Sequence, residues 1–543
     1  MSTRRQGGLV QAVRLCALWV LVAACEVTPP VRLVTPAKSE YQAIRQAMGT
    51  EALFRERDGL TFSGTRAYPR KSDSEEAVER PVSLSLRPNG AFLLSVGVEE
   101  SASSLGYDGR QAWTANPRGI AREVGLGARE HQLVDGWLRT SLWLAPGNEH
   151  FAISPVQASP EPQNFELRLK LIGQPIEATL LVDARTQRPL SYTITKNARV
   201  RRVLLDDWRE IEGVWFPHEM TETLDGETLH VDRFVQRTRG APRSFGKPPS
   251  LPTDVSFGPE ASIETRVDQG GRFYVRASVG TLENAWMLLD TGFGSHAIHV
   301  GLADAAGMIA GEAAQLQGVS GAGSGYWVQT EQLTVGKFEQ RAPRFITVDT
   351  SFLSDRAGFD VAGILGVPLF QRAVVTLDEP RGRVSLEDPQ GFERSGLEWF
   401  PISQDGTSPC LDGHIVASGA VTKRLFFRLD TGSDDTVTIA EWAARSFHLI
   451  GDRANLRATR IEGAFGTILG WRKTLDAVEL GPMGAEAGLR LVHPEATLLR
   501  SSAPGPLSNP WIAGNLGTRA LRGCRVVLDL TAARISIQSD ETK

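Results

Sequence analysis

Two short segments of the sequence place an aspartate directly after a run of apolar residues. Residues 285–300 read AWMLLDTGFGSHAIHV and contain Asp290, and residues 424–440 read RLFFRLDTGSDDTVTIA and contain Asp430. One such segment alone is also typical of a surface turn, because Asp and Gly are common turn residues. The repetition of Asp-Thr-Gly after two similar apolar runs requires a further explanation.

Two carboxylates brought together could perform acid and base chemistry. Like charges a few ångströms apart do not both ionise, so such a pair shares one proton. One carboxylate could then take a proton from a water molecule while the other protonates a carbonyl oxygen. We therefore expect Asp290 and Asp430 to belong to one site.

The residues that follow each aspartate favour this arrangement. Gly292 and Gly432 have no Cβ, so backbone amide groups could approach the carboxylates closely. Thr291 and Thr431 carry hydroxyl groups that could form hydrogen bonds between the two loops. Each Asp-Thr-Gly segment is therefore expected to supply the carboxylate and also to hold it in position.

The elements that would position the two aspartates are also repeated. Residues 273–292 align with residues 414–432, and residues 362–386 (AGILGVPLFQRAVVTLDEPRGRVSL) align with residues 513–537 (AGNLGTRALRGCRVVLDLTAARISI). A repeat of this length is a duplicated domain, because solenoid units are several-fold shorter. We expect two β-rich lobes whose carboxylates meet across a pseudo-two-fold axis.

With both copies in place, residues 261–543 resemble the pepsin and retropepsin superfamily, as two retropepsin-like lobes in one chain. The family's second signal, two apolar residues and a glycine, is met at 364–366 (Ile-Leu-Gly) and less closely at 515–517 (Asn-Leu-Gly). The resemblance implies an aspartic-type peptidase with Asp290 and Asp430 as its catalytic pair. It implies a protein or peptide substrate, with no metal and no cofactor.

The resemblance also assigns supporting roles. The supporting loop residues are Thr291, Gly292, Thr431, Gly432 and Ser433, and the candidate flap glycines, which in retropepsins lie over the substrate, are Gly321, Gly323, Gly325, Gly463 and Gly466. Phe293 departs from the family, which commonly has a small residue after Asp-Thr-Gly.

The N-terminus predicts export. Basic residues precede an apolar segment that is short for a membrane span and ends in LVAAC at residues 21–25. This ending resembles the lipobox of bacterial lipoproteins, which implies lipidation of Cys25 and a location in the bacterial cell envelope, lipid-anchored at a periplasmic or outer-membrane surface. A cleaved secretory signal or a transmembrane segment is the alternative. Export permits a disulfide between Cys410 and Cys524, and two buried thiols are the other possibility.

The expected fold is mainly β, with a bilobal pair of aspartic-protease-like barrels and an additional N-terminal antiparallel β-sheet. That sheet loosely resembles the half-barrels of bacterial lipoprotein carriers at 107–116 (YDGRQAWTAN) and 208–220 (WREIEGVWFPHEM). The expected division is 1–24 signal peptide, 25–39 tether, 40–237 N-terminal sheet, 238–260 Pro/Gly-rich linker, 261–395 first lobe and 396–543 second lobe.

The net charge of −4 argues against a general nucleic-acid partner. The leading hypothesis is an envelope-anchored aspartic endopeptidase, a monomer whose lobes form an internal pseudo-dimer. The alternative is a non-catalytic envelope lipoprotein that binds peptide or lipid on a silent protease scaffold. A third possibility pairs the lobes between two chains.

Overall fold

The structure is a computed structural model, and it describes residues 38–53, 59–69, 78–98, 102–144, 151–155, 163–172, 176–196, 199–211, 213–242, 244–318, 321–451, 456–463, 466–481, 489–500, 507, 509 and 511–539. The expected signal peptide and Cys25 lie outside the described residues. Among the helices that are described, none is long and apolar enough to cross a membrane.

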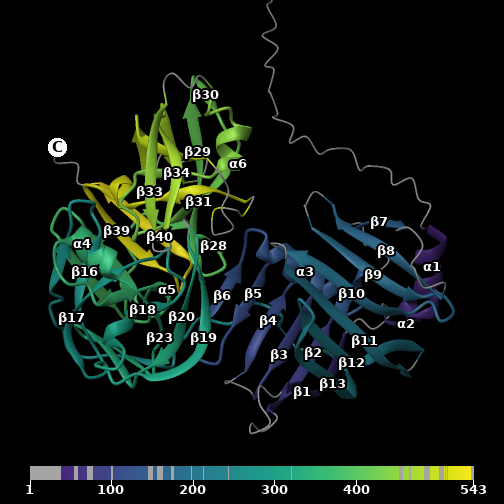
Figure 1. The fold of residues 1–543 in the computed structure, drawn as a ribbon. Coiled ribbons are helices and arrows are strands. Elements are labelled where there is room, and N and C mark those ends of the chain that lie inside the picture. Colours follow the sequence, from purple (N-terminus) through teal and green to yellow (C-terminus); the bar gives the residue numbers. More distant parts are fainter. Residues whose placement is uncertain are drawn as a thin grey trace, which may run out of the picture.

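The fold is mainly β, which confirms the expected fold class. Figure 1 shows a broad sheet formed by the N-terminal half of the chain beside a more compact body formed by the C-terminal half. The helices are short and lie at the edges or on the faces of sheets: α1 (Lys38–Ala47), α2 (Thr50–Leu53), α3 (Ala128–Arg139), α4 (Ser351–Ala357), α5 (Val367–Phe370) and α6 (Glu441–Ser446).

The N-terminal sheet joins two antiparallel meanders through the pairing of β1 with β13. Its 13 described strands are, in spatial order, β6 (Ala121–Val124), β5 (Ala112–Ala115), β4 (Ser103–Tyr107), β3 (Phe92–Val96), β2 (Val78–Leu86), β1 (Leu60–Tyr68), β13 (Glu227–Arg239), β12 (Val214–Leu224), β11 (Arg199–Ile211), β10 (Pro189–Lys196), β9 (Glu177–Asp183), β8 (Asn164–Leu171) and β7 (Phe151–Pro155).

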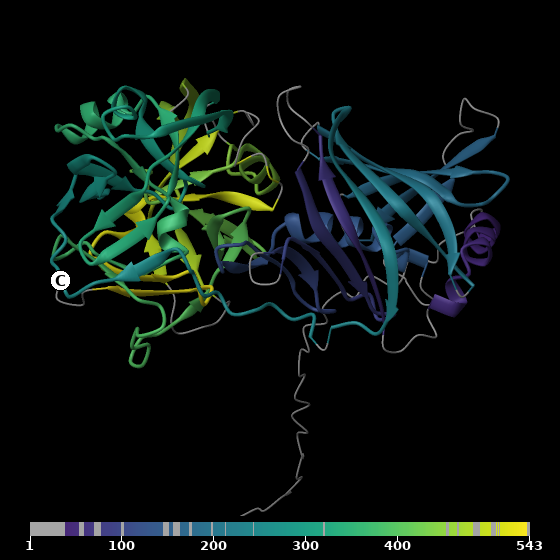
Figure 2. The ribbon, with the colours of Figure 1, turned by 90° about the horizontal axis from the view of Figure 1, so that it is seen from below.

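This sheet is strongly curled, as Figure 2 shows from below. Helix α3 packs against one of its faces, where the Trp137 indole donates to the Gly90 carbonyl at 3.0 Å. Gly90 has φ 89° in the turn between β2 and β3, a conformation that favours glycine. We call this sheet with α3 the half-barrel.

Two further sheets of 11 described strands each hold the Asp-Thr-Gly segments, and we call them the first and second lobes. The first contains β14 (Val255–Phe257), β15 (Thr265–Val267), β16 (Phe273–Val279), β17 (Leu282–Leu289), β18 (His296–His299), β19 (Ile309–Gln317), β20 (Ala322–Gln329), β21 (Gln332–Val335), β22 (Phe338–Arg341), β23 (Arg344–Val348) and β24 (Gly363–Leu365). The second contains β28 (Ser403–Asp405), β29 (Ser408–Ala417), β30 (Ala420–Val421), β31 (Leu425–Leu429), β32 (Val437–Ile439), β33 (Arg457–Gly463), β34 (Gly466–Thr474), β35 (Ala477–Leu480), β36 (Leu489–Val492), β37 (Glu495–Leu499) and β38 (Ile512–Leu516).

The two lobes repeat one pairing pattern. In the first, β17 runs parallel to β24, β24 is antiparallel to β18, and β18 is parallel to β23. In the second, β31 is parallel to β38, β38 is antiparallel to β32, and β32 is parallel to β37. The sequence repeat is therefore also a repeat of topology.

A five-stranded sheet joins the lobes. It runs β26 (Arg383–Glu387), β25 (Val374–Asp378), β39 (Cys524–Asp529), β40 (Arg534–Ser539) and β27 (Phe400–Pro401). The antiparallel pair β25 and β39 comes from the equivalent part of each repeat, and its side chains belong to one hydrophobic core that extends into both lobes. This shared core fixes one lobe against the other.

The segment expected as a linker is bonded to its neighbours. The Trp113 indole donates to the Phe245 carbonyl at 2.7 Å, and the Leu251 amide donates to the Gly119 carbonyl at the same distance. Residues 255–257 form β14, which pairs with β22 of the first lobe. The Pro/Gly-rich segment is therefore held by hydrogen bonds to the half-barrel and to the first lobe.

Candidate functional site

Each aspartate stands where a central strand ends in a loop. Asp290 follows β17, and its amide donates to the Leu365 carbonyl at 3.1 Å. Asp430 follows β31, and its amide donates to the Leu516 carbonyl at 2.9 Å. Because the last residues of both strands, 285–289 and 427–429, are buried, the carboxylates are held at the edge of a packed core.

The structure brings the two aspartates together. A Cβ added to Gly292 would lie 2.5 Å from the Asp430 Oδ1, and a Cβ added to Gly432 would lie 2.4 Å from the Asp290 Cγ. Each glycine of the supporting loops thus faces the carboxylate of the other lobe. Only a residue without a side chain fits there, as the two Asp-Thr-Gly segments predicted.

Thr291 and Thr431 link the two loops through four hydrogen bonds, and both residues are fully buried. The Thr291 hydroxyl donates to the Leu429 carbonyl at 2.7 Å, and the Thr431 hydroxyl donates to the Leu289 carbonyl at 2.9 Å. Each hydroxyl also accepts from the amide of the other threonine, at 3.1 and 3.0 Å. These reciprocal bonds explain why threonine occupies both positions.

Burial and proximity raise the pKa of both carboxyl groups. Desolvation, and next the charge of Asp430, raise the pKa of Asp290 to about 7. Burial also raises the pKa of Asp430. Like charges this close resist joint ionisation, so the pair retains a proton in the acidic to neutral range.

Asp430 is the better acceptor of the pair. The Asn515 amide nitrogen donates to its Oδ2 at 2.8 Å. The nearby Arg428 guanidinium, and hydrogen bonds from the backbone amides of Gly432 and Ser433, favour its ionised form. Asp290 has equivalent contacts with Arg428 and with the amides of Gly292 and Phe293, so the Asn515 bond is what distinguishes Asp430 as the acceptor. This bond favours the retained proton on Asp290, which gives the site one donor and one acceptor side by side.

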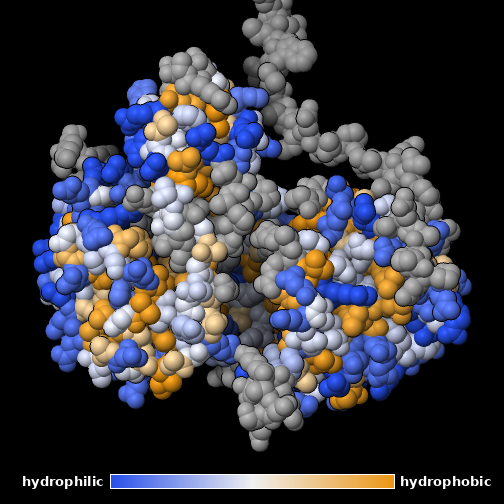
Figure 3. Space-filling model, in the orientation of Figure 1, coloured by the Kyte–Doolittle hydropathy of each residue, from blue (hydrophilic) through white to orange (hydrophobic). Residues whose placement is uncertain are grey.

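The pair lies on the floor of a cleft between the lobes with a volume of about 510 Å³. Side chains from both lobes line it, and they include leucine, isoleucine and phenylalanine as well as arginine and aspartate. On the face of the molecule shown in Figure 3, hydrophilic residues surround separate hydrophobic patches on both halves. A cleft of this size holds a ligand as large as a short peptide segment.

The predicted flap segments are β-hairpins at the cleft. Gly321 precedes β20, and Gly323 and Gly325 lie within it, while Gly463 ends β33 and Gly466 begins β34. Of these five glycines, Gly463 lines the cleft, together with neighbours of the hairpins such as Leu316 and Ile461. Gly325 instead packs on β23, since an added Cβ would lie 2.2 Å from the Thr347 carbonyl oxygen.

The sequence motifs did not point to Arg428 as a site residue. It donates to the Gly292 carbonyl at 3.2 Å and to the Ser408 hydroxyl at 2.6 Å, and it lines the cleft. The comparison of the two repeats contained a signal for Arg428, because the first repeat has the apolar Leu288 at the equivalent position before its Asp-Thr-Gly. A charged residue at a buried strand position is informative.

Cys410 and Cys524 are free, buried thiols. The structure therefore has two thiols and no disulfide between them. Burial raises the pKa of Cys410 to about 12, which leaves its thiol protonated and unreactive. Within the described ranges, no three His, Cys, Asp or Glu side chains lie together in a way that would hold a metal ion.

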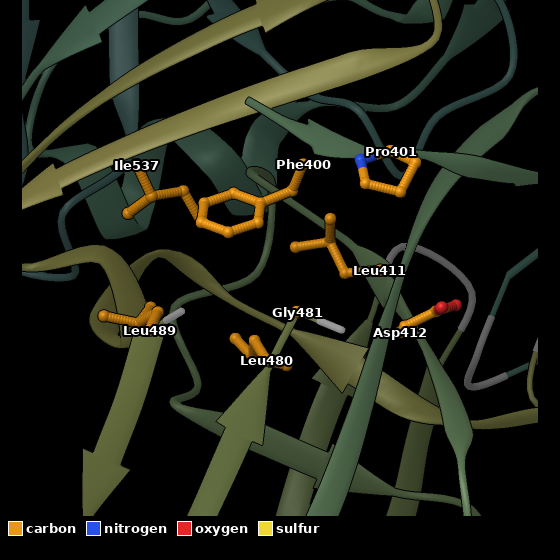
Figure 4. Close-up of a pocket in the computed structure, with 8 residues that line it drawn as sticks. All are labelled: Phe400, Pro401, Leu411, Asp412, Leu480, Gly481, Leu489 and Ile537. Atoms are coloured by element: carbon orange, nitrogen blue, oxygen red, sulfur yellow. The ribbon is translucent and has the colours of Figure 1, made fainter. Parts of the chain in front are cut away.

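A second hollow lies between the second lobe and the five-stranded sheet. Figure 4 shows the apolar side chains of Phe400, Leu411, Leu480, Leu489 and Ile537 around it. Its volume is about 10 Å³, which is at most the space of one water molecule. It is a packing gap rather than a ligand site.

No family model and no curated protein matches the sequence. Among solved structures, a LolA superfamily protein from Nitrosomonas europaea is 11% identical, with 37% of this chain and 94% of that chain covered and a TM-score of 0.28. A domain described as an outer membrane lipoprotein-sorting protein from Vibrio parahaemolyticus is 12% identical, with 37% and 92% covered and a TM-score of 0.27. A DUF1329 family protein from Desulfovibrio piger is 11% identical, with 38% and 93% covered and a TM-score of 0.28.

These comparisons correct the leading expectation. The three structures named above are a LolA superfamily protein, a lipoprotein-sorting domain and a DUF1329 protein, and none of the three is a pepsin-like or retropepsin-like protease. The expected family, the aspartic-type peptidase activity and the hydrolase and protease descriptions are therefore wrong. Two Asp-Thr-Gly segments specify how carboxylates are placed, and placement alone does not establish an activity.

Proposed function

We propose that this chain is a ligand-binding protein of the bacterial envelope, with the cleft between its two lobes as the binding site for an extended peptide. The observation that carries the proposal is the donor and acceptor pair on the cleft floor. Asp290 holds the proton, and Asp430 accepts hydrogen bonds. A peptide backbone offers the matching groups, since each residue has one carbonyl acceptor and one amide donor.

An acyl chain fits this cleft less well than a peptide does. Asp290, Asp430 and Asn515 all line the floor, and a hydrocarbon covering them would remove water without replacing its hydrogen bonds. Leaving such groups without partners costs about 1–3 kcal/mol each. The same groups favour a ligand that carries its own amides and carbonyls.

Envelope localisation is part of the proposal. It is supported by the apolar segment and LVAAC ending at residues 15–25, which resemble a lipoprotein signal. Acylation of Cys25 would leave the described residues outside the membrane and joined to it by the expected tether 25–39. Peptides or unfolded segments in the envelope would then reach the cleft directly.

The test is peptide binding by the purified full-length chain and by three variants. A pool of unstructured synthetic peptides is offered at pH 5, and the bound peptides are identified and quantified by mass spectrometry. We expect Asp290→Asn to bind as the wild type does, because its amide replaces the protonated carboxyl as a donor. We expect Asp430→Asn to lose at least tenfold in affinity, because it lacks the anionic acceptor.

Asp304→Asn is the matched control, since Asp304 is exposed and does not line the cleft. It should bind as the wild type does. Peptide fragments produced by the wild type and absent with Asp290→Asn would overturn the proposal, because binding alone breaks no bond. Failure of every chain to bind any peptide would overturn it as well.

A second candidate is lipid binding by the half-barrel. The favouring observation is that α3 covers an apolar face of the curled sheet, where Gly136 of the helix lies against the buried Phe92 ring of β3. Displacement of α3 would expose this face to an acyl chain. Leu126 and Gly127, just before the helix, both have positive φ and mark a turn that positions it.

A charged cluster under α3 opposes that displacement. The Arg139 guanidinium contacts Asp135 and Glu222, and the Tyr192 hydroxyl donates to Asp135 at 2.5 Å. Lipid binding is tested by extracting acyl species from the purified chain and by displacement of a fluorescent fatty acid. Stoichiometric lipid that leaves peptide binding unchanged would support this second site, and absence of both signals would contradict it.

A further inference from the structure

The two walls of the cleft differ at equivalent positions of the repeat. In the first lobe, Leu288 on β17 is aligned with Ile364 on β24, and both line the cleft. In the second lobe, Arg428 on β31 is aligned with Asn515 on β38 at the same place in the pattern, and both also line it. The first-lobe wall therefore has apolar residues at the positions where the second-lobe wall has polar ones.

The first-lobe wall contains one cluster of apolar side chains, beside charged residues that include Arg356. Beside Leu288 and Ile364, its lining residues include Phe293, Leu316, Phe352 and Leu353. They come from the loop after Asp290, from the β19–β20 hairpin and from α4, so they surround one region of the cleft. This region fits an apolar side chain, which would be removed from water on several sides.

The second-lobe wall has polar atoms without partners. Arg428 is 4% exposed and Asn515 is 3% exposed, and Arg428 Nε and Asn515 Oδ1 lack a hydrogen-bond partner among the described residues. Buried polar atoms are normally bonded, so an unpaired donor and acceptor on a cleft wall indicate a place for a polar ligand group.

Two exposed arginines extend this wall. Arg460 and Arg519 line the cleft, and neither makes an ion pair within the part of the chain that the structure describes. Arg472 is already engaged, since its guanidinium contacts Glu495 and lies 3.8 Å from Asp435. The cationic charge available to a ligand therefore lies at Arg460 and Arg519.

The acidic residues of the same wall have partners of their own. The Thr438 hydroxyl donates to Asp435 at 2.9 Å, and Arg472 approaches that carboxylate. Asp434 lies against Gly270, and its charge acts on Arg272. Arg519 acts on the charge of Asp435 from a distance, but neither Arg460 nor Arg519 forms a direct ion pair with an acid of the described residues, so both guanidinium groups can still contact an anionic ligand group.

We propose that the cleft selects peptides in which a large apolar side chain is followed or preceded closely by a carboxylate, with the apolar group against Leu288 and Ile364 and the carboxylate against Arg460 and Arg519. This rests on the proposed function of the same cleft. The carboxylate comes either from an acidic side chain or from the C-terminus of the peptide. Exposed ion pairs are typically worth about 0.5–0.7 kcal/mol each, so two of them give roughly a five- to tenfold preference.

The experiment measures dissociation constants of the full-length chain by fluorescence anisotropy with four labelled peptides at pH 6. Two have a central Leu followed closely by Glu or by Gln, with amidated ends. The other two end in Leu, with a free or an amidated C-terminus. We expect at least one carboxylate peptide to bind five- to tenfold more tightly than its neutral partner. A preference for Glu over Gln would identify an acidic side chain as the source of the carboxylate, and a preference for the free C-terminus would identify the peptide terminus.

The double variant Arg460→Gln/Arg519→Gln should reduce the affinity for the carboxylate peptide to that for its neutral partner. Arg457→Gln is the matched control, because Arg457 lies on the same strand but pairs with Glu495 and does not line the cleft. The Arg457→Gln variant should keep the preference for the carboxylate peptide. Added salt should weaken this preference.

The outcomes separate two failures. If all four peptides bind equally well to the wild type, or if the double variant keeps the preference, the selection for a carboxylate is wrong and peptide binding stands. If none of the peptides binds, the proposed function fails and the selection fails with it.

Discussion

At the scale of single residues, the defining feature is a carboxyl group that stays protonated near neutral pH. Asp290 has a pKa raised to about 7 by burial and by its neighbour Asp430. In the unfolded chain the same group ionises near its ordinary value of 3.8. The folded state therefore binds more protons than the unfolded state between these two values.

This difference predicts how stability depends on pH. A raised carboxyl pKa makes the folded state most favourable below about pH 4, and the advantage declines as pH rises to about 7. Asp290→Asn carries no charge, so we expect it to be more stable than the wild type at pH 8, by on the order of 4 kcal/mol, and similar to it at pH 4. Urea unfolding at both pH values measures this, and an equal or lower stability of the variant at pH 8 would contradict it.

The hydroxyl bonds between the loops give a second residue-scale prediction. Thr291→Val keeps the shape of the side chain but leaves the Leu429 carbonyl and the Thr431 amide without partners in a fully buried place. We expect a loss of about 2–4 kcal/mol in the free energy of unfolding. Thr228→Val, at an exposed position of β13, is the control and should change it by less than about 0.5 kcal/mol. Similar effects of the two substitutions would show that the hydroxyl bonds contribute little.

The site residues that could be predicted from the sequence are those that lie next to one another in a short motif. Asp290, Thr291 and Gly292 form one short segment, and the repeat of that segment indicated that the two copies meet. The polar roles of Arg428 and Asn515 depend on β31 and β38 lying side by side, although the two residues are far apart in the sequence. Spacing along the chain does not contain that information.

At the scale of elements, a close crossing fixes each aspartate loop. A Cβ on Gly517, after β38, would lie 2.2 Å from the Asp435 carbonyl oxygen, and backbone atoms cannot move aside as a flexible side chain can. We expect Gly517→Ala to lower the free energy of unfolding by about 1–3 kcal/mol and to weaken peptide binding. Gly391→Ala has open space around it and should do neither. Equal unfolding midpoints for the two variants would contradict this account of the crossing.

Helix α3 depends on the charged cluster beneath it. Arg139 is 3% exposed and contacts Asp135, Glu222 and Asp232. Arg201 also pairs with Asp135 and Glu222, and Arg66 pairs with Asp232, but Arg139 is the most buried of the three arginines. Arg139→Met leaves these acids without it, and we expect a loss of about 3–5 kcal/mol. The exposed pair of Arg233 with Glu219 supplies the control, since Arg233→Met should cost less than about 1 kcal/mol. A small effect of Arg139→Met in urea unfolding would mean that packing alone holds the helix.

The strands were more predictable than this cluster. The sequence predicted an N-terminal antiparallel β-sheet, and strands β1 to β13 form one. The cluster joins α3 to β10, β11, β12 and β13, and its members read in the sequence as ordinary charged residues on half-exposed strands. Their burial results from the curl of the sheet.

At the scale of the whole molecule, the half-barrel is docked on the lobes. The Arg118 guanidinium contacts Asp254 at 3.0 Å and donates to the Ala342 carbonyl, and Asn509 donates to the Leu126 carbonyl. Gly127 lies so close to Trp511 that an added Cβ would be 2.6 Å from its ring. The sequence predicted a boundary near residues 238–260 but not these contacts, which join segments far apart in the chain.

Membrane attachment is also a property of the whole chain. If Cys25 is acylated, Cys25→Ser moves the protein from the membrane fraction to the soluble envelope fraction without a change in its unfolding midpoint, because the described core lies after the tether. Fractionation followed by immunoblotting measures this. A variant that remains with the membrane would contradict lipid anchoring at Cys25 and favour an uncleaved apolar segment.

The central claim is that Asp290 and Asp430 bind a peptide as donor and acceptor, and the most direct test is peptide affinity measured from pH 5 to pH 9 for the wild type and Asp290→Asn, with mass analysis of the peptide afterwards. The account predicts that wild-type affinity falls as pH rises through about 7, where Asp290 loses its proton. It predicts a flat profile for the variant and an intact peptide throughout. A variant that cannot bind, or peptide cleaved by the wild type alone, would contradict it.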